Sequence, residues 1–308
     1  MTPRLSIGLP VYNGERYLAQ ALDSLLAQTF RDFELIICDN ASTDSTAETC
    51  KRYTEADARV RYHRHRSNIG AARNFQSTLQ LARAPLFKWA SADDLCLPEF
   101  LERCVAALGE DPDAVLAFPS TVLIDGDGKL LDSYEDIDVR DDTPVARFDR
   151  VLSTIGRCNA QYGVTYTDAL RRTGGMRSYN GGDVVLLAEL ALYGKLVRLP
   201  ERLFCRRMHP LASSAMDDRQ RAEFYNPGHG ERMEMYRWKM AASLLAVAWR
   251  VPAGIAAKYR TLSVVLRHLR WARYELWREL RDRVRYLWRR RWRQSGWGAA
   301  ARSRGRVV

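Results

Sequence analysis

Length, charge and hydropathy narrow the class of protein. The chain has 308 residues, with 48 Lys or Arg against 37 Asp or Glu and a formal net charge of +11. This length can bury the core of one large α/β domain, or of a domain with an appendage. No apolar run reaches the roughly 18 residues of a membrane-spanning helix, and Met1–Arg4 carries no hydrophobic signal segment. We therefore expect a protein that is neither exported nor membrane-spanning.

The charge is unevenly distributed along the chain. Residues 236–308 contain 19 basic and 3 acidic residues, which leaves 29 basic and 34 acidic residues in 1–235. Six cysteines occur singly, with no Cys-x-x-Cys pair and no nearby His at metal-ligand spacing. Reduced thiols in the cytoplasm fit this pattern.

The first part of the chain alternates apolar strands with amphipathic helices. This alternation is typical of a parallel sheet flanked by helices. Strands are predicted at 5–9, 33–38, 60–63 and 86–90, and helices at 15–27, 44–53 and 71–82.

The pattern then becomes more mixed. The acidic segment 132–147, which contains Pro144, is predicted to be a surface loop, and Asp125–Gly128 is typical of a hairpin turn. Helices are predicted at 98–108, 168–173, 183–193 and across 236–293, and strands at 114–119, 196–199 and 203–205.

Asp93 and Asp94 follow the buried strand at 86–90. Ligands of open α/β sheets bind at the carboxyl ends of the strands. Two adjacent carboxylates repel each other unless they hold a cation, accept backbone N–H groups or share a proton. The pair therefore predicts either a Mg²⁺ or Mn²⁺ site shared with substrate phosphates, or the cap of a helix near Pro98.

Five blocks, in order, carry a family resemblance: Pro10–Glu15, Gln28–Leu35, Asp39–Asp44, Asn68–Asn74 and Ala92–Asp94. They resemble the signature of inverting family 2 glycosyltransferases, over roughly residues 4–214. The resemblance implies a GT-A fold, an α/β architecture whose Rossmann-like, mostly parallel sheet is flanked by helices. It divides the chain into a domain at 1–235, with a nucleotide-sugar half at 1–97 and an acceptor half at 98–235, and a basic, Trp-rich helical extension at 236–308.

The resemblance also implies which residues bind the nucleotide-sugar donor. Tyr12 would stack on the nucleotide base, Asp39 would accept an N–H of the base, and Arg73 would face the diphosphate or the metal carboxylates. A packing tyrosine, a turn aspartate and a solvated arginine are the structural alternatives. The nucleotide-sugar set comprises Pro10, Tyr12, Asn13, Glu15, Asp39, Arg73 and Asp93.

A metal site is implied at Asp93, Asp94 and His209 for Mn²⁺ or Mg²⁺, with Asp94 the first choice for direct coordination. The motif here is Ser-Ala-Asp-Asp, with Ser91 where many members have an aspartate. Arg207, two residues before His209, could pair with phosphate.

Asp183, after Gly181-Gly182, stands where the family places its catalytic base. As a general base it would deprotonate the acceptor hydroxyl, and one displacement without an enzymic nucleophile inverts the anomeric carbon. A helix N-cap is the alternative for Asp183, and Glu189 is an alternative base.

The implied function is metal-dependent sugar transfer from a nucleotide-diphosphate donor to an acceptor hydroxyl, in cell-surface glycan or polysaccharide synthesis. UDP is the default nucleotide, with GDP and dTDP open. A sugar nucleotidyltransferase is one alternative, although no Gly-rich phosphate loop follows the first strand. A non-catalytic nucleotide-sugar or glycan-binding protein is the other.

Seven of the eight tryptophans lie in the last 73 residues, together with many arginines. This composition favours an anionic membrane surface, hence a peripheral location at the inner face of the membrane and a glycan or lipid-linked acceptor. The alternative is that the tryptophans pack the helices together. No nucleic-acid-binding motif accompanies the charge.

Overall fold

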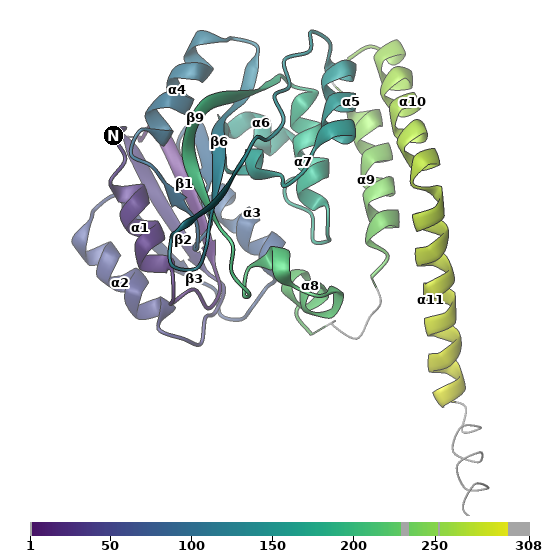
Figure 1. Ribbon diagram of the computed structural model, residues 1–308, viewed down its shortest axis with the longest axis horizontal. Helices are drawn as coiled ribbons and strands as arrows, with labels where there is room; N and C mark the ends of the chain where they lie inside the picture. Colours follow the sequence, from purple (N-terminus) through teal and green to yellow (C-terminus); the bar gives the residue numbers. More distant parts are fainter. Residues whose placement is uncertain (1, 229–233, 252, 295–308) are drawn as a thin grey trace, which may run out of the picture.

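A nine-stranded sheet with helices against its faces forms the body of the protein (Figure 1). The computed structural model describes residues 2–228, 234–251 and 253–294. The strand order is β3-β2-β1-β4-β8-β6-β9-β5, and β7 pairs with β6 outside this path. The strands are β1 (Leu5–Val11), β2 (Phe33–Asp39), β3 (Val60–Arg64), β4 (Leu86–Trp89), β5 (Leu95–Cys96), β6 (Ala114–Ile124), β7 (Leu130–Tyr134), β8 (Val164–Tyr166) and β9 (Lys195–Arg207).

The first four strands are parallel. β1 pairs with β2 and β4, and β2 pairs with β3. Every residue of β1, β2 and β4 is buried, as expected for strands covered by helices on both faces. The predicted α/β class and mostly parallel sheet are confirmed, and the carboxyl ends of these strands meet at one edge.

The second part of the sheet is mixed. β8 is antiparallel to both β4 and β6, while β9 runs parallel to β6 and antiparallel to β5. The two strands predicted at 196–199 and 203–205 are one strand, β9. Pro200 lacks an N–H, and the ladder skips it through register shifts next to Pro119 and Ser120.

The prediction that 132–147 is a surface loop is wrong at both ends of this segment. β7 continues to Tyr134, and a helix, α5 (Pro144–Thr154), begins at Pro144. The Thr143 side chain caps this helix by accepting from the Ala146 N–H at 3.2 Å. Proline is favoured at the first helical position because its missing N–H would have no partner there.

The remaining helices cover the sheet or follow it. In 236–293 the structure has three helices, the first two of which reach the core of the body through Leu244, Val247, Val264 and Val265. Short 3₁₀ helices lie at Asn159–Tyr162 and Ser213–Ala215. The other helices are α1 (Leu18–Leu26), α2 (Thr46–Ala56), α3 (Ala71–Leu81), α4 (Phe100–Glu110), α6 (Thr167–Arg172), α7 (Gly182–Ala191), α8 (Asp218–Tyr225), α9 (Tyr236–Arg250), α10 (Ile255–Trp271) and α11 (Arg273–Gln294).

α10 and α11 follow one another along one side of the molecule, and α11 extends beyond the body (Figure 1). Among the described residues, no helix is both long enough and apolar enough to cross a membrane. All six cysteines are free and buried. Burial raises the pKa of each thiol, to about 12 for Cys38 and Cys50 and to about 11 for Cys205.

Candidate active site

The loop after β1 forms one end of the site. Asn13 has a left-handed backbone conformation, with φ of 50°, and its Oδ1 accepts the Thr43 N–H at 2.8 Å. Glu15 accepts the Ser45 N–H at 3.0 Å. These bonds tie the loop to the start of α2 and leave the Tyr12 side chain 46% exposed.

Asparagines link the neighbouring strand ends. Asn40 donates to the Asn68 side chain at 2.7 Å and accepts the Ile69 N–H at 2.8 Å. Asn74 donates to the Cys38 carbonyl at 2.8 Å and contacts His65 Nε2 at 3.1 Å. Asn40, Asn68 and Asn74 all line the cleft described below.

Asp39 lies beneath these residues. Its side chain is fully buried, and its oxygens accept from the Ser42 N–H at 2.8 Å and the Tyr62 hydroxyl at 2.7 Å. Burial raises the pKa of Tyr62, and the hydrogen bond to Asp39 adds to that rise. In this arrangement Asp39 supports the loop, and its contact with a nucleotide base stays a prediction.

Asp93 and His209 meet inside the site. One Asp93 oxygen lies 2.9 Å from His209 Nε2, and the other accepts from Ser91. Burial by itself raises the pKa of Asp93, but the bonds to His209 and Ser91 outweigh it and hold that pKa below its ordinary value. His209 Nδ1 is buried and has no hydrogen-bond partner among the described atoms.

Asp94 points the other way. It is 8% exposed, and its Oδ1 accepts the backbone N–H of Arg207 at 2.8 Å. Burial, with the neighbouring Asp93 charge, raises the pKa of Asp94 to about 8. Asp93 lines the cleft while Asp94 accepts the Arg207 N–H, and direct metal coordination by Asp94 stays a prediction.

Arg207 is the centre of the hydrogen bonds under the site. Its guanidinium donates to the carbonyls of Asp93 at 2.9 Å and Gly126 at 2.9 Å, and to the Gln20 side chain at 2.8 Å. It also lies 4.6 Å from the ring centroid of Tyr17, which contacts His209. Because Arg207 is only 2% exposed, this geometry does not support the expected pairing with substrate phosphate.

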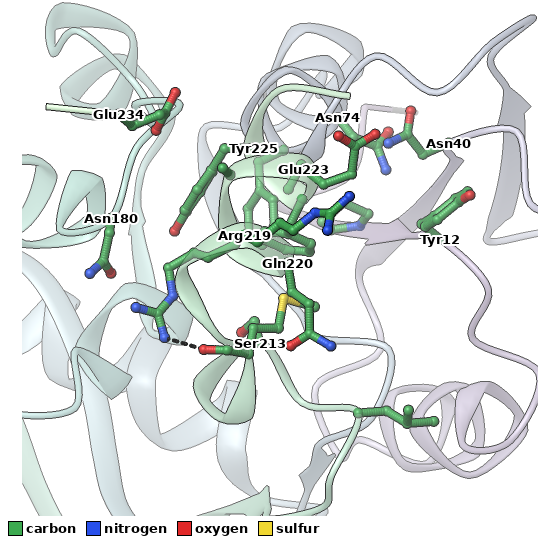
Figure 2. Close-up of a pocket in the computed structure, with 18 of the residues that line it drawn as sticks. Tyr12, Asn40, Asn74, Asn180, Ser213, Arg219, Gln220, Glu223, Tyr225 and Glu234 are labelled. Carbon is green, nitrogen blue, oxygen red and sulfur yellow. Dashed lines mark hydrogen bonds between the residues drawn. The ribbon is translucent and has the colours of Figure 1, made fainter. Parts of the chain in front are cut away.

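A cleft of about 2060 Å³ joins these parts. Tyr12 and Asn40 lie on one side and Asn180 and Glu234 on the other, with Arg219, Gln220, Glu223 and Tyr225 of α8 between them (Figure 2). The starts of α9 and α11 complete the wall, and α11 contributes Glu275, Arg278, Glu279, Asp282 and Tyr286.

The predicted site residues divide into two groups. Pro10, Tyr12, Asn13, Asp93 and His209 line the cleft. The other predicted residues are not among the described residues that line the cleft. These are Glu15, Asp39, Arg73, Asp94 and Asp183.

Asp183 is half-buried in the first turn of α7, three residues after Asn180 of the cleft wall. Burial raises the pKa of Tyr225, and the charge of Asp183 adds to this rise. Tyr225 and Asn180 both line the cleft, and the base role of Asp183 stays a prediction. The alternative base, Glu189, is 1% exposed and pairs with Arg177 at 2.6 Å, which leaves it enclosed by the fold.

The sequence matches a known family over half of its length. The model for "Glycosyl transferase family 2" matches residues 6–160, from β1 to the segment before β8. The chain belongs to glycosyl transferase family 2. The predicted family is thereby confirmed.

Relatives of this family 2 chain are similar over a shorter segment. The putative glycosyltransferase EpsE of Bacillus subtilis is 35% identical over 107 residues, which cover 34% of this chain and 38% of EpsE. The chondroitin synthase of Escherichia coli is 30% identical over 130 residues, which cover 42% of this chain and 19% of that protein. The matched segments thus span well under half the length of these two relatives.

Solved structures share the fold of this family 2 chain. S. aureus TarS residues 1–349 in complex with UDP align with a TM-score of 0.63 at 16% identity, covering 89% of this chain and 73% of that one. The mannosyltransferase PcManGT of Pyrobaculum calidifontis, in complex with GDP-Man and Mn²⁺, aligns with a TM-score of 0.51 at 16% identity, covering 93% and 85%. The expected GT-A fold is confirmed.

Much of the cleft wall in this family 2 chain comes from residues that the sequence did not single out. Asn40, Asn68 and Asn74 stand in the blocks that carry the resemblance, so their position at strand ends was a usable signal. α8 and the inner residues of α11 come after residue 160, where the family model ends. The sequence did not predict a helix at α8, and the helical pattern predicted across 236–293 did not show which face meets the cleft.

Proposed function

We propose that this chain transfers a sugar, with inversion, from a nucleotide-diphosphate donor to a hydroxyl of a glycan acceptor. The main support is one cleft that holds exposed Tyr12 at one end and the Asp93–His209 pair within it, in a family 2 chain. Small-molecule pockets commonly span about 300–1000 Å³. The cleft, at about 2060 Å³, has room for a donor and an acceptor together.

The residues of the cleft fit a divalent cation shared with the donor. One carboxylate and one imidazole converge at Asp93 and His209, and the buried Nδ1 of His209 still lacks a partner among the described atoms. The described residues contain no group of three or more His, Cys, Asp or Glu side chains placed to hold a metal. Asp93 and His209 would therefore hold Mn²⁺ or Mg²⁺ together with diphosphate oxygens. Such a cation neutralises charge on the departing diphosphate.

Asp183 is the proposed general base. It would accept the proton of the acceptor hydroxyl while that oxygen bonds to the anomeric carbon. The bond from this carbon to the diphosphate oxygen breaks at the same time, and the diphosphate leaves with the electron pair. Tyr12 would hold the nucleotide base by stacking. The division into a transferase domain at 1–235 and an extension at 236–308 stays part of this proposal.

The donor is proposed to be a UDP-sugar, with GDP- and dTDP-sugars as the competitors. TarS was solved with UDP and with UDP-GlcNAc, and PcManGT with GDP-Man. The test is release of nucleoside diphosphate by purified protein from a panel of these donors, with Mn²⁺, Mg²⁺ or EDTA. We expect release from one donor and its loss in EDTA. Metal-dependent binding without release, even with a panel of glycan acceptors, would favour a binding protein. Release of pyrophosphate from a nucleoside triphosphate and a sugar phosphate would favour a nucleotidyltransferase.

Replacing each of the two adjacent aspartates with asparagine, one at a time, tests the metal site. Asp93→Asn is expected to weaken metal-dependent nucleotide binding by at least about tenfold, since second-shell changes alone cost about 10–100-fold. Asp94→Asn is the matched control, because its amide oxygen can still accept the Arg207 N–H, and we expect less than about a threefold change. Titration of each variant with Mn²⁺ and nucleoside diphosphate measures its loss of metal-dependent nucleotide binding. A larger loss for Asp94→Asn would return the ligand role to Asp94.

We also propose that the enzyme acts in the cytoplasm at the inner face of the membrane, in the synthesis of a surface glycan. The support is the basic composition of 236–308 and the six free thiols.

A further inference from the structure

α10 and α11 carry a line of large apolar side chains on the side away from the body. These side chains are between 54% and 70% exposed and recur at spacings of three, four, seven or eight residues, which places them along one helical face. The opposite face of α10 packs Thr261, Val264 and Val265 inward. We call the exposed line the outer stripe: Ile255, Tyr259, Leu266, Tyr274, Trp277, Val284 and Trp288.

The acidic residues of these helices all lie on the inner face. All three acidic residues of 236–308, which are Glu275, Glu279 and Asp282, line the cleft. Glu279 is 8% exposed and accepts the Arg237 and Trp238 N–H groups at the start of α9, each at 3.3 Å. A surface helix normally turns its polar face to water and its apolar face to the core. α11 instead turns its acidic residues to the cleft and large apolar side chains outward, and its docking onto α9 fixes that orientation.

Arginines stand beside the outer stripe. The side chains of Arg281 and Arg285 are 57% and 63% exposed, and both lie within 4 Å of Asp282, which offsets only one of their two charges. Over residues 255–294, Lys and Arg outnumber Asp and Glu by 13 to 3. With Arg281 and Arg285 beside the outer stripe, the outward surface is apolar, aromatic and cationic together.

We propose that the outer stripe lies on an anionic membrane surface, with α10 and α11 parallel to it. Trp and Tyr fill the headgroup boundary, where their rings are buried and their polar atoms stay wet, and arginines attract anionic lipid. The charge of this surface argues against dimerisation through the outer stripe, because a symmetric pair would set one arginine-rich face against another.

This orientation also specifies the acceptor, an assignment that rests on the proposed function. The inner face of α11 lines the cleft while its outer face would touch the headgroups, so only one helix, roughly 10 Å thick, separates cleft and membrane. A glycan carried on a lipid could enter the cleft while its anchor stays in the bilayer. The outer stripe thus points to a lipid-linked glycan as the acceptor.

The test is flotation of the full-length protein with vesicles of phosphatidylcholine, with or without phosphatidylglycerol. We expect binding only to the anionic vesicles, weakening as salt rises. Trp277→Ala with Trp288→Ala should lower the affinity at least about tenfold. Arg281→Gln with Arg285→Gln should lower it by about fivefold for each arginine.

Matched controls lie off the stripe. Trp249→Ala removes an exposed tryptophan of α9, and Lys51→Gln with Arg52→Gln removes two exposed charges of α2. Equal binding by stripe and control variants, or no binding to anionic vesicles, would overturn the proposal. Self-association that the stripe variants abolish, without vesicle binding, would replace the membrane with a second copy. Nucleoside diphosphate release, measured in parallel, separates this proposal from the transferase activity, because stripe variants should release normally.

Discussion

Asp183→Asn is expected to lower kcat for sugar transfer by about 10²–10⁴-fold, the usual contribution of a general base, and to leave donor affinity within about twofold. Asparagine keeps the size of the side chain and can still accept the Val184 N–H, which Asp183 accepts at 2.9 Å. It cannot take the acceptor proton. Steady-state rates with saturating donor and acceptor measure kcat, and nucleotide titration measures donor affinity.

Asp168→Asn is the matched control, since Asp168 is also an aspartate in the first turn of a helix, α6, and its side chain is 83% exposed. Both variants lose a charge near a helix N-terminus, worth about 0.3–1 kcal/mol of stability, but only Asp183→Asn should lose turnover. If Asp183→Asn kept most of the wild-type rate, another group would have to be the base. Glu189 could serve only after its buried pair with Arg177 had opened.

Arg207→Met is expected to lower the free energy of unfolding by about 3 kcal/mol or more and to weaken metal-dependent nucleotide binding. Methionine fills the space but leaves the carbonyls of Asp93 and Gly126 and the Gln20 side chain without their donor. Each buried polar group left without a partner costs about 1–3 kcal/mol. Denaturant unfolding measures the first effect, and titration with Mn²⁺ and nucleotide measures the second.

Arg206→Met is the control on the adjacent residue. Arg206 donates to the Arg157 carbonyl at 2.8 Å and to the Asn159 side chain at 2.6 Å, away from Asp93. We expect a smaller loss of stability and normal nucleotide binding. Arg207→Lys keeps the charge but not the forked geometry, so it should fold and still bind nucleotide more weakly. Normal nucleotide binding by folded Arg207→Lys would show that Arg207 only stabilises the fold and does not position Asp93.

The fold was predictable where the pattern was local. The alternation of strands and helices up to residue 90 predicted the parallel half of the sheet, because β1, β2 and β4 are mostly apolar and the helices between them have one apolar face. β3 is more polar and gave a weaker signal. The mixed half was harder, since the pairing of β8 between β4 and β6 joins segments far apart in the chain. Pro144 was taken as part of a loop because proline ends helices, yet it also starts them when a residue such as Thr143 supplies the cap.

The site was predictable to the level of the segment, but less well to the level of the atom. Asp93 and Asp94 are adjacent, and only the pairing of β5 with β9 decides which carboxylate turns inward to the Arg207 N–H. The support that Tyr62 gives to Asp39 could not be predicted locally, because Tyr62 lies in β3, 23 residues further along the chain. The contribution of α11 to the cleft depends on how it docks against α9, through Glu279 and a Trp238–Leu276 hydrogen bond, which no local pattern records.

The six buried cysteines can report where and when the fold of this protein opens. Their raised pKa values keep the thiols protonated near neutral pH, and the fold shields them from reagents. They are spread over β2, α2, β5, α4, the segment before β8, and β9. Modification by an alkylating reagent therefore requires local or global unfolding. The order in which the six react, read by mass spectrometry, gives the relative stability of each region of the sheet without any added label.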